Sequence, residues 1–150
     1  MLTQGQTQFA QTMVLQANRS GHIWPNYAAA EACLESAWGT SGLCQKARNI
    51  FGLKAPEAWT GETISIPTEE FLKREWVVVP ALWCSFATFA DAFTERMHVL
   101  RANPAYATAI LAETGPEFVL LASQHWATDP ERGQKVLSVY RSHPEIFGTA

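Results

Sequence analysis

The most informative part of the sequence is residues 30–54, AEACLESAWGTSGLCQKARNIFGLK. It begins inside a segment of small apolar residues, which predicts a helix that starts at Pro25 and ends near Gly39, a residue suited to a left-handed cap. Glu35 then lies in the last turn of this helix. A glutamate in that position is either a solvated surface residue or a group with a chemical role.

Several neighbouring features favour a Glu35 carboxyl group that keeps its proton. The C-terminal end of a helix dipole is negative and opposes a carboxylate. Glu31 lies one turn earlier on the same face and, when ionised, repels a second negative charge. Leu34 and Trp38 can reduce the local hydration. Glu35 is therefore our candidate general acid, the group that protonates a leaving oxygen.

Residues 30–54 also contain the motifs LES-x-WG and N-x-FG-x-K. Together they resemble the glucosaminidase family of bacterial peptidoglycan hydrolases, which includes autolysins and flagellar rod-assembly hydrolases. Further motifs follow in the family's order, so that the resemblance covers roughly residues 22–142. They are TEEF at 68–71, FxTxxxAF at 86–93, NPxY at 103–106 and ATDP at 127–130.

The resemblance implies a lysozyme-like fold and hydrolysis of a β-1,4 bond of the glycan strand, after N-acetylglucosamine. It carries the role of catalytic glutamate to Glu35, and it implies no cofactor and no metal. The family's second acid lies in a T-x-E-aromatic segment, which maps to Glu70. Glu69 remains the alternative, because adjacent strand residues point to opposite faces. Two carboxylates around an oxocarbenium-like transition state are the usual arrangement in glycosidases.

The motif residues also include the candidates for substrate binding. These candidates are Trp38, Asn49, Phe51, Lys54 and Trp126. The aromatic rings can stack on sugars, and the lysine can meet a substrate carboxylate. Trp126 stands where the family often has a tyrosine before its ATDP segment, and an indole N–H can only donate a hydrogen bond. Asp129 within ATDP is explained by helix capping.

The remaining pattern predicts an α+β fold that is mainly helical, with a small β-hairpin lobe bordering a substrate cleft. We treat residues 1–150 as a single catalytic domain. Helices are expected at about 7–17, 25–39, 88–103 and 105–112, from 116, and from 129–131 onward. Residues 40–61 look irregular, and residues 62–83 look like a hairpin that turns at 72–75. Pro67 and Pro80 indicate that its strands are short or irregular at their edges.

The composition excludes several classes of function. A net charge of −3 without any basic run gives no support for a nucleic-acid partner. No apolar stretch approaches the ~18 residues that a membrane span needs. Three cysteines without paired spacing indicate buried free thiols rather than a disulfide, and no histidine stands at zinc-ligand spacing from them. We expect a monomer whose partner is the peptidoglycan glycan strand.

The cellular context is an expectation from the first residues, MLTQGQTQFAQ, which lack the cationic and apolar regions of a secretory signal. We expect a protein made without a signal peptide that reaches the cell wall, in the periplasm or outside. Release through a phage holin, as for an endolysin, or through a secretion or flagellar apparatus would provide the route. Two other functions stay open: a lytic transglycosylase, in which one glutamate acts as acid and then base, and a non-catalytic peptidoglycan-binding module.

Overall fold

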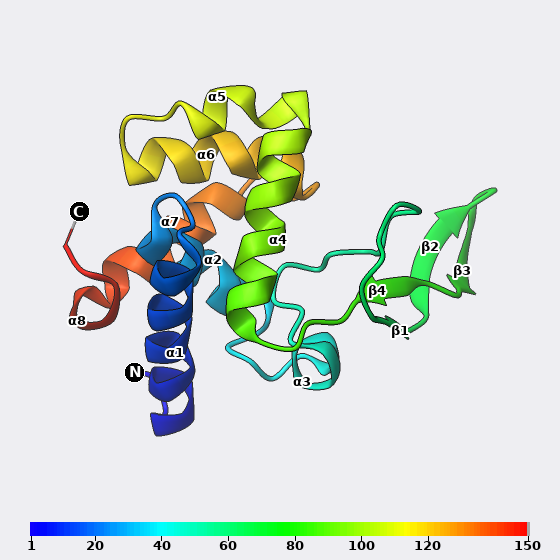
Figure 1. The fold of residues 1–150 in the computed structure, drawn as a ribbon, viewed down its shortest axis with the longest axis horizontal. Coiled ribbons are helices and arrows are strands. Elements are labelled where there is room, and N and C mark those ends of the chain that lie inside the picture. Colours follow the sequence, from blue (N-terminus) through cyan, green and yellow to red (C-terminus); the bar gives the residue numbers. More distant parts are fainter. Residues whose placement is uncertain (150) are drawn as a thin grey trace.

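The computed structural model describes residues 1–149 and has a helical body from which a small β-lobe projects (Figure 1). The α-helices are α1 (Gln4–Ser20), α2 (Pro25–Glu35), α3 (Gly42–Ala47), α4 (Phe89–Ala102), α5 (Ala107–Ile110), α6 (Gly115–Trp126), α7 (Arg132–Ser142) and α8 (Pro144–Phe147), with a 3₁₀ turn at Pro104–Tyr106. The strands are β1 (Thr63–Ser65), β2 (Thr68–Leu72), β3 (Glu75–Val79) and β4 (Leu82–Cys84). The expected α+β, mainly helical architecture with a small β-lobe is confirmed.

Helix α1 is longer at both ends than the predicted 7–17. A capping box starts it: the Thr3 side chain accepts from the Gln6 N–H, and the Gln6 side chain accepts from the Thr3 N–H. Gly21, with φ of 75°, ends it in the left-handed region. The first turn is polar, so the apolar pattern alone did not reveal it.

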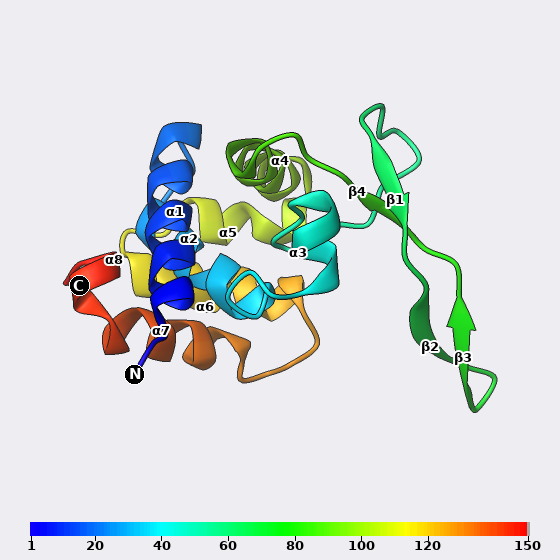
Figure 2. The same cartoon turned by 90° about the horizontal axis from the view of Figure 1, so that it is seen from below.

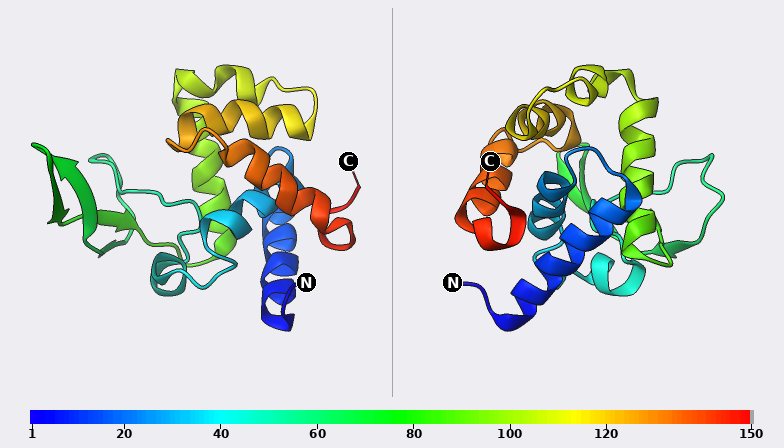
Figure 3. Two further views of the ribbon diagram at one scale, coloured as in Figure 1. Left: turned by 180° about the vertical axis from the view of Figure 1, so that it is seen from behind. Right: turned by 60° about the vertical axis from the view of Figure 1, so that its left-hand side comes forward.

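Helix α2 is the central helix of the body and packs against α1 on one side and α7 on another (Figure 3). Its residues 27–33 are all buried, and the small side chains among them let neighbouring helices approach closely. The helix ends at Glu35 rather than near Gly39. The Ser36 hydroxyl donates to the Ala32 carbonyl, and Ala37 has φ of 50°, so the chain turns away immediately after Glu35.

The β-lobe consists of two short antiparallel ladders rather than one continuous hairpin, and Figure 2 shows β2 and β3 well away from the helices. One ladder pairs β1 with β4, and the other pairs β2 with β3. Pro67 and Pro80 lie between the ladders, where a residue without an N–H costs least. The hairpin turns at Lys73 and Arg74, both with positive φ, as expected for a tight two-residue connection.

Other predictions met mixed outcomes. Helix α4 begins directly after Thr88, whose side chain accepts from the Asp91 N–H, as predicted. Helix α3 is new, because the region 40–61 was expected to be irregular; the Ser41 side chain caps it by accepting from the Cys44 N–H. Helix α8 was also not expected.

The core lies between the helices and contains the predicted phenylalanines Phe93 and Phe118, both fully buried. The three cysteines are free and buried, as expected. Burial raises the pKa of Cys33 to about 12, which keeps its thiol protonated. None of the helices within residues 1–149 is long and apolar enough to cross a membrane.

Candidate active site

Glu35 lies at the end of α2 with its side chain 24% exposed, although the helix before it is buried. The Nε of Arg132, the first residue of α7, donates to Oε1 of Glu35 over 2.7 Å. The negative end of the α2 dipole and the guanidinium thus act on this carboxylate in opposite directions. Glu35 is the glutamate of α2 that solvent reaches.

Glu31 has a different environment from the one that the sequence suggested. Its carboxylate is fully buried and receives two hydrogen bonds from Arg96, at 3.0 and 2.7 Å, while Nη1 of Arg132 lies 2.9 Å from its Oε2. Burial by itself raises the pKa of Glu31, but the charges of Arg96 and Arg132 outweigh it and lower the pKa to about 2. Glu31 is therefore ionised, and the two arginines offset the repulsion that we expected it to exert on Glu35.

A hollow of about 310 Å³ lies between the lobe and the helical body. It is lined by Phe51, Gly52, Leu53, Lys54, Trp83, Tyr106 and Trp126. The Arg96 guanidinium lies beneath it, 4.7 Å from the centre of the Phe51 ring and 4.4 Å from that of Trp126. The buried cluster of Glu31, Arg96 and Arg132 therefore connects Glu35 to the aromatic floor of this hollow.

Glu70 and Glu69 point to opposite faces of the β2–β3 hairpin. Glu70 is half-buried, and its Oε1 accepts from the Lys54 Nζ over 3.1 Å, so it contacts a residue that lines the hollow. Glu69 is exposed on the other face, opposite Val78. This difference favours Glu70 as the second carboxylate.

The predicted substrate-binding residues are not all brought together. Phe51, Lys54 and Trp126 line the hollow, and the Trp126 indole donates to the Phe51 carbonyl at 3.3 Å. Trp38 instead packs its ring edge-to-face with His143, at 5.9 Å between ring centres, on the side of the C-terminal helices. This contact indicates packing between the turn that follows α2 and the end of α7.

Asn49 also has a different role from the one expected. It is 1% exposed, its amide donates to the carbonyls of Leu53 and Cys84, and its oxygen accepts from the Leu53 N–H. These bonds leave the side chain no access to a ligand. Asn49 anchors the segment that carries Phe51 and Lys54, so the expected substrate contact is replaced by a positioning role.

Three residues of the site were missed from the sequence. Trp83 and Tyr106 line the hollow, and Arg132 binds both glutamates of α2. Tyr106 belongs to a motif that we noted, NPxY, but nothing in its spacing placed it next to Trp126. Arg132 follows the helix start Asp-Pro-Glu and has no local pattern that distinguishes it from a surface arginine.

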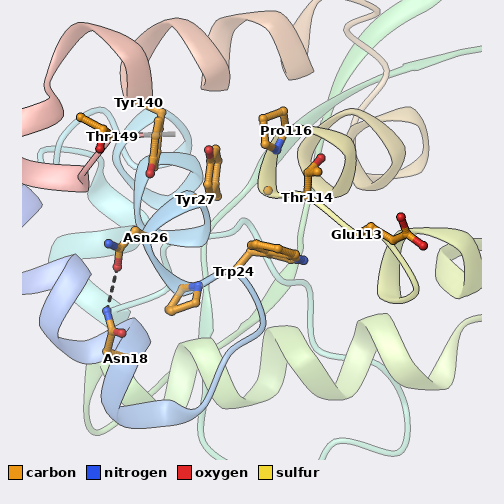
Figure 4. Close-up of a pocket in the computed structure, with 11 residues that line it drawn as sticks. Asn18, Trp24, Asn26, Tyr27, Glu113, Thr114, Pro116, Tyr140 and Thr149 are labelled. Atoms are coloured by element: carbon orange, nitrogen blue, oxygen red, sulfur yellow. Dashed lines mark hydrogen bonds between the residues drawn. The ribbon is translucent and has the colours of Figure 1, made fainter.

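A larger hollow, about 630 Å³, lies at the opposite end of α2 (Figure 4). Its lining includes Trp24, Tyr27 and Tyr140, and Glu113 is its one carboxylate among the described lining residues. Helix α2 starts there and ends at Glu35, so the two ends are roughly 15 Å apart. We assign the site to the smaller hollow, because Lys54 in its lining contacts Glu70 and the Arg96 guanidinium beneath it belongs to the cluster that reaches Glu35.

No group of three or more potential metal ligands occurs within the described part of the chain. The ionisable groups at the site are carboxylates, buried arginines, one lysine and Tyr106. The accessible carboxylates can transfer protons to a bound sugar, and the charged groups can stabilise the charge that develops.

Comparisons with known proteins show the family and the fold of this chain. A family model described as mannosyl-glycoprotein endo-beta-N-acetylglucosaminidase, of the glucosaminidase family, matches residues 11–145. Peptidoglycan hydrolase FlgJ of Vibrio parahaemolyticus is 34% identical over 124 residues, which cover 78% of this chain and 40% of that protein. The chain therefore spans less than half the length of this relative.

Two solved structures share the fold. The glycoside hydrolase domain of Salmonella typhimurium FlgJ, truncated at its C-terminus, superposes with a TM-score of 0.75 and 25% identity over 93% of this chain and 98% of that domain. The catalytic domain of the autolysin Auto from Listeria monocytogenes has a TM-score of 0.81 and 20% identity over 99% of this chain and 88% of that domain, a likeness of fold alone.

Proposed function

The chain belongs to the glucosaminidase family, and from this we propose that it is a peptidoglycan hydrolase. It is a glycoside hydrolase that cleaves a β-1,4 bond of the glycan strand, after N-acetylglucosamine. The names of its relatives, a peptidoglycan hydrolase and a glycoside hydrolase domain, support the reaction class. Its substrate is the polymer of the bacterial cell wall.

One observation supports the catalytic assignment most directly. Helix α2 carries two glutamates one turn apart, and they differ in access: Glu31 is fully buried, whereas the Glu35 side chain is 24% exposed. Only Glu35 can meet a substrate oxygen. Glu31 instead neutralises the arginines that surround it.

The proposed mechanism begins with a proton on Glu35. Glu35 gives this proton to the glycosidic oxygen as the bond to the anomeric carbon breaks, and positive charge develops on the sugar ring. Glu70 stabilises that charge or activates the attacking water. Lys54 holds Glu70 at 3.1 Å in the free protein, so this ion pair must open or shift when the substrate binds. Phe51 and Trp126 offer apolar surface to the sugars.

The place of action that we propose is the cell wall, in the periplasm or outside the cell. For the route to the wall, we propose release through a phage holin, as for an endolysin. We also propose that residues 1–150 belong to one catalytic domain and that the protein acts as a monomer.

Activity on purified peptidoglycan, with mass spectrometry of the products, tests the function. Hydrolysis yields new reducing ends at N-acetylglucosamine, whereas a lytic transglycosylase yields anhydro ends. Glu35→Gln is expected to lower kcat by about 10²–10⁴-fold while glycan pull-down remains. Glu113→Gln, in the distant hollow, is the matched control and should retain activity. A wild-type protein that binds wall material but never cleaves it contradicts the enzyme assignment.

The adjacent pair Glu69 and Glu70 provides a second test. Glu70→Gln should reduce kcat strongly, and Glu69→Gln should leave it within about threefold of wild type, because the two side chains lie on opposite faces of the hairpin. The reverse pattern would transfer the role to Glu69.

A further inference from the structure

Arg132 is buried at the start of α7, where it binds both glutamates of α2. Its Nε donates to Oε1 of Glu35 over 2.7 Å, and its Nη1 lies 2.9 Å from Oε2 of Glu31 and 2.7 Å from the Ser123 hydroxyl. The side chain is 3% exposed. Because three acceptors on α2 and α6 hold the guanidinium, the fold sets its position and solvent does not.

The chain around Arg132 is built to place it there. The Asp129 carboxylate accepts from the Glu131 N–H, and the Asp129 carbonyl accepts from the Arg132 N–H, which fixes the turn that leads into α7. Gly133 lets α7 approach α6 closely: a Cβ at this position would lie 2.9 Å from Cδ2 of Leu120. The ATDP motif and this glycine together bring the guanidinium to the end of α2.

The contact with Arg132 makes the two oxygens of the Glu35 carboxyl group unequal. Oε1 is occupied by Arg132, and within residues 1–149 Oε2 has no hydrogen-bond partner. The structure assigns Arg132 as the positioning residue of Glu35: it holds Oε1, so that Oε2 carries the proton and presents it to the glycosidic oxygen. This inference rests on the proposed function.

The same contact acts on the charge that the reaction creates. When Glu35 protonates the leaving oxygen, its O–H bond and the glycosidic C–O bond break, a new O–H bond forms on the leaving sugar, and Glu35 becomes a carboxylate. That carboxylate forms against a guanidinium already in place, which favours the transition state without rearrangement. Positive charge develops on the sugar ring in the same step, and Glu31 and Arg96 remain paired, so among Glu35 and the buried cluster only Glu35 changes its charge.

An arginine fits this role better than a lysine. The planar guanidinium uses Nε for one glutamate and Nη1 for the other, two directions that a single ammonium group cannot reproduce. A lysine keeps the positive charge and loses the fixed geometry. The two properties can therefore be separated by substitution.

The experiment compares Arg132→Ala, Arg132→Lys and the control Lys135→Met, which lies one turn later on α7 in an exposed pair with Asp129. Each variant is first checked by circular dichroism and thermal unfolding, and kcat and KM are then measured on soluble peptidoglycan strands. Arg132→Ala is expected to lose about 10²-fold in kcat with KM within threefold of wild type, because the acid is displaced while the sugar sites remain. Arg132→Lys should lose about tenfold in kcat, and Lys135→Met should be unchanged.

Millimolar guanidinium provides a readout that a purely structural role would not move. It should raise the kcat of Arg132→Ala at least tenfold and should leave the kcat of Glu35→Gln unchanged. A folded Arg132→Ala with kcat within threefold of wild type would overturn the assignment, as would a loss confined to KM. If Arg132→Ala does not fold, the test uses Arg132→Lys, and a kcat of Arg132→Lys equal to that of wild type overturns the proposal. Wild-type protein that never cleaves peptidoglycan defeats the proposed function instead.

Discussion

Replacing Glu31 by glutamine tests the buried charge cluster at the centre of the molecule. Glu31 is fully buried, and its two oxygens accept from Arg96, which has no exposed surface, and from Arg132. Glu31→Gln keeps the shape and removes the charge, so that two buried guanidinium groups lose their counter-ion. Breaking a buried ion pair from one side costs about 3–5 kcal/mol of unfolding free energy.

The pKa of Glu31 gives an independent figure of similar size. Arg96 and Arg132 lower the pKa from 4.5 to about 2 against the effect of burial. At about 1.36 kcal/mol for each pH unit, this corresponds to roughly 3 kcal/mol of unfolding free energy. Because the folded pKa lies below the unfolded one, the contribution is complete above about pH 4.5 and is lost as the pH falls through 2.

Urea unfolding at pH 7, followed by tryptophan fluorescence, measures the effect. Glu31→Gln should lose about 3–5 kcal/mol relative to wild type. This difference in unfolding free energy should be smaller at pH 3, because the ionised Glu31 of wild type contributes less stability below about pH 4.5. Lys135→Met, which removes an exposed ion pair, is the control and should match wild type. A loss below about 1 kcal/mol at pH 7, or one independent of pH, would refute the reasoning.

Three further substitutions test other features. Burial and the nearby Arg96 lower the pKa of His22 from 6.5 to about 4, so the unfolded chain binds more protons than the folded chain between these pH values. In urea unfolding, the wild-type free energy of unfolding should therefore fall by about 2 kcal/mol from pH 7 to pH 5. This fall should be absent in His22→Gln. Asn49→Asp replaces a donating amide with an acceptor that faces two buried carbonyls. It should lower the free energy of unfolding, measured in urea, by about 3 kcal/mol and leave KM unchanged. A rise in KM without any loss of stability would instead support a substrate-binding role for Asn49. Gly115→Ala places a Cβ 2.1 Å from Cε2 of Tyr27 and should lower the free energy of unfolding by about 1–3 kcal/mol. A thermal midpoint equal to that of wild type would show that the Tyr27 ring moves aside without cost.

Much of the helical order was predictable because its signals are local. Thr88 caps α4, whose apolar periodicity marks its buried face, and Pro25 starts α2, which the run of small residues indicated. The boundaries were less accurate. The end of α2 at Glu35 depends on a Ser36 hydroxyl bond and on successive left-handed residues, and neither has a distinctive local composition.

The chemistry of single residues was predictable only in part. Residues 30–54 identified Glu35 as the candidate acid from its place in the last turn of a helix. The same motif suggested Asn49 as a substrate ligand, but burial and three hydrogen bonds use the side chain entirely for folding. A motif residue can be needed for a site without touching the ligand, and the sequence does not separate the two cases.

The sequence by itself determined the class of fold, the family and the helix that carries the candidate acid, because each of these depends on short-range patterns or on motifs in a set order. Tertiary structure alone decided which groups face Glu35. Arg132 stands 97 positions further along the chain, and Arg96 is separated from Glu31 by 65. These contacts exist because α7 packs against α2 and because the long Arg96 side chain reaches Glu31 from α4, which packs against α1. Packing between distant helices depends on the shapes of all the side chains between them.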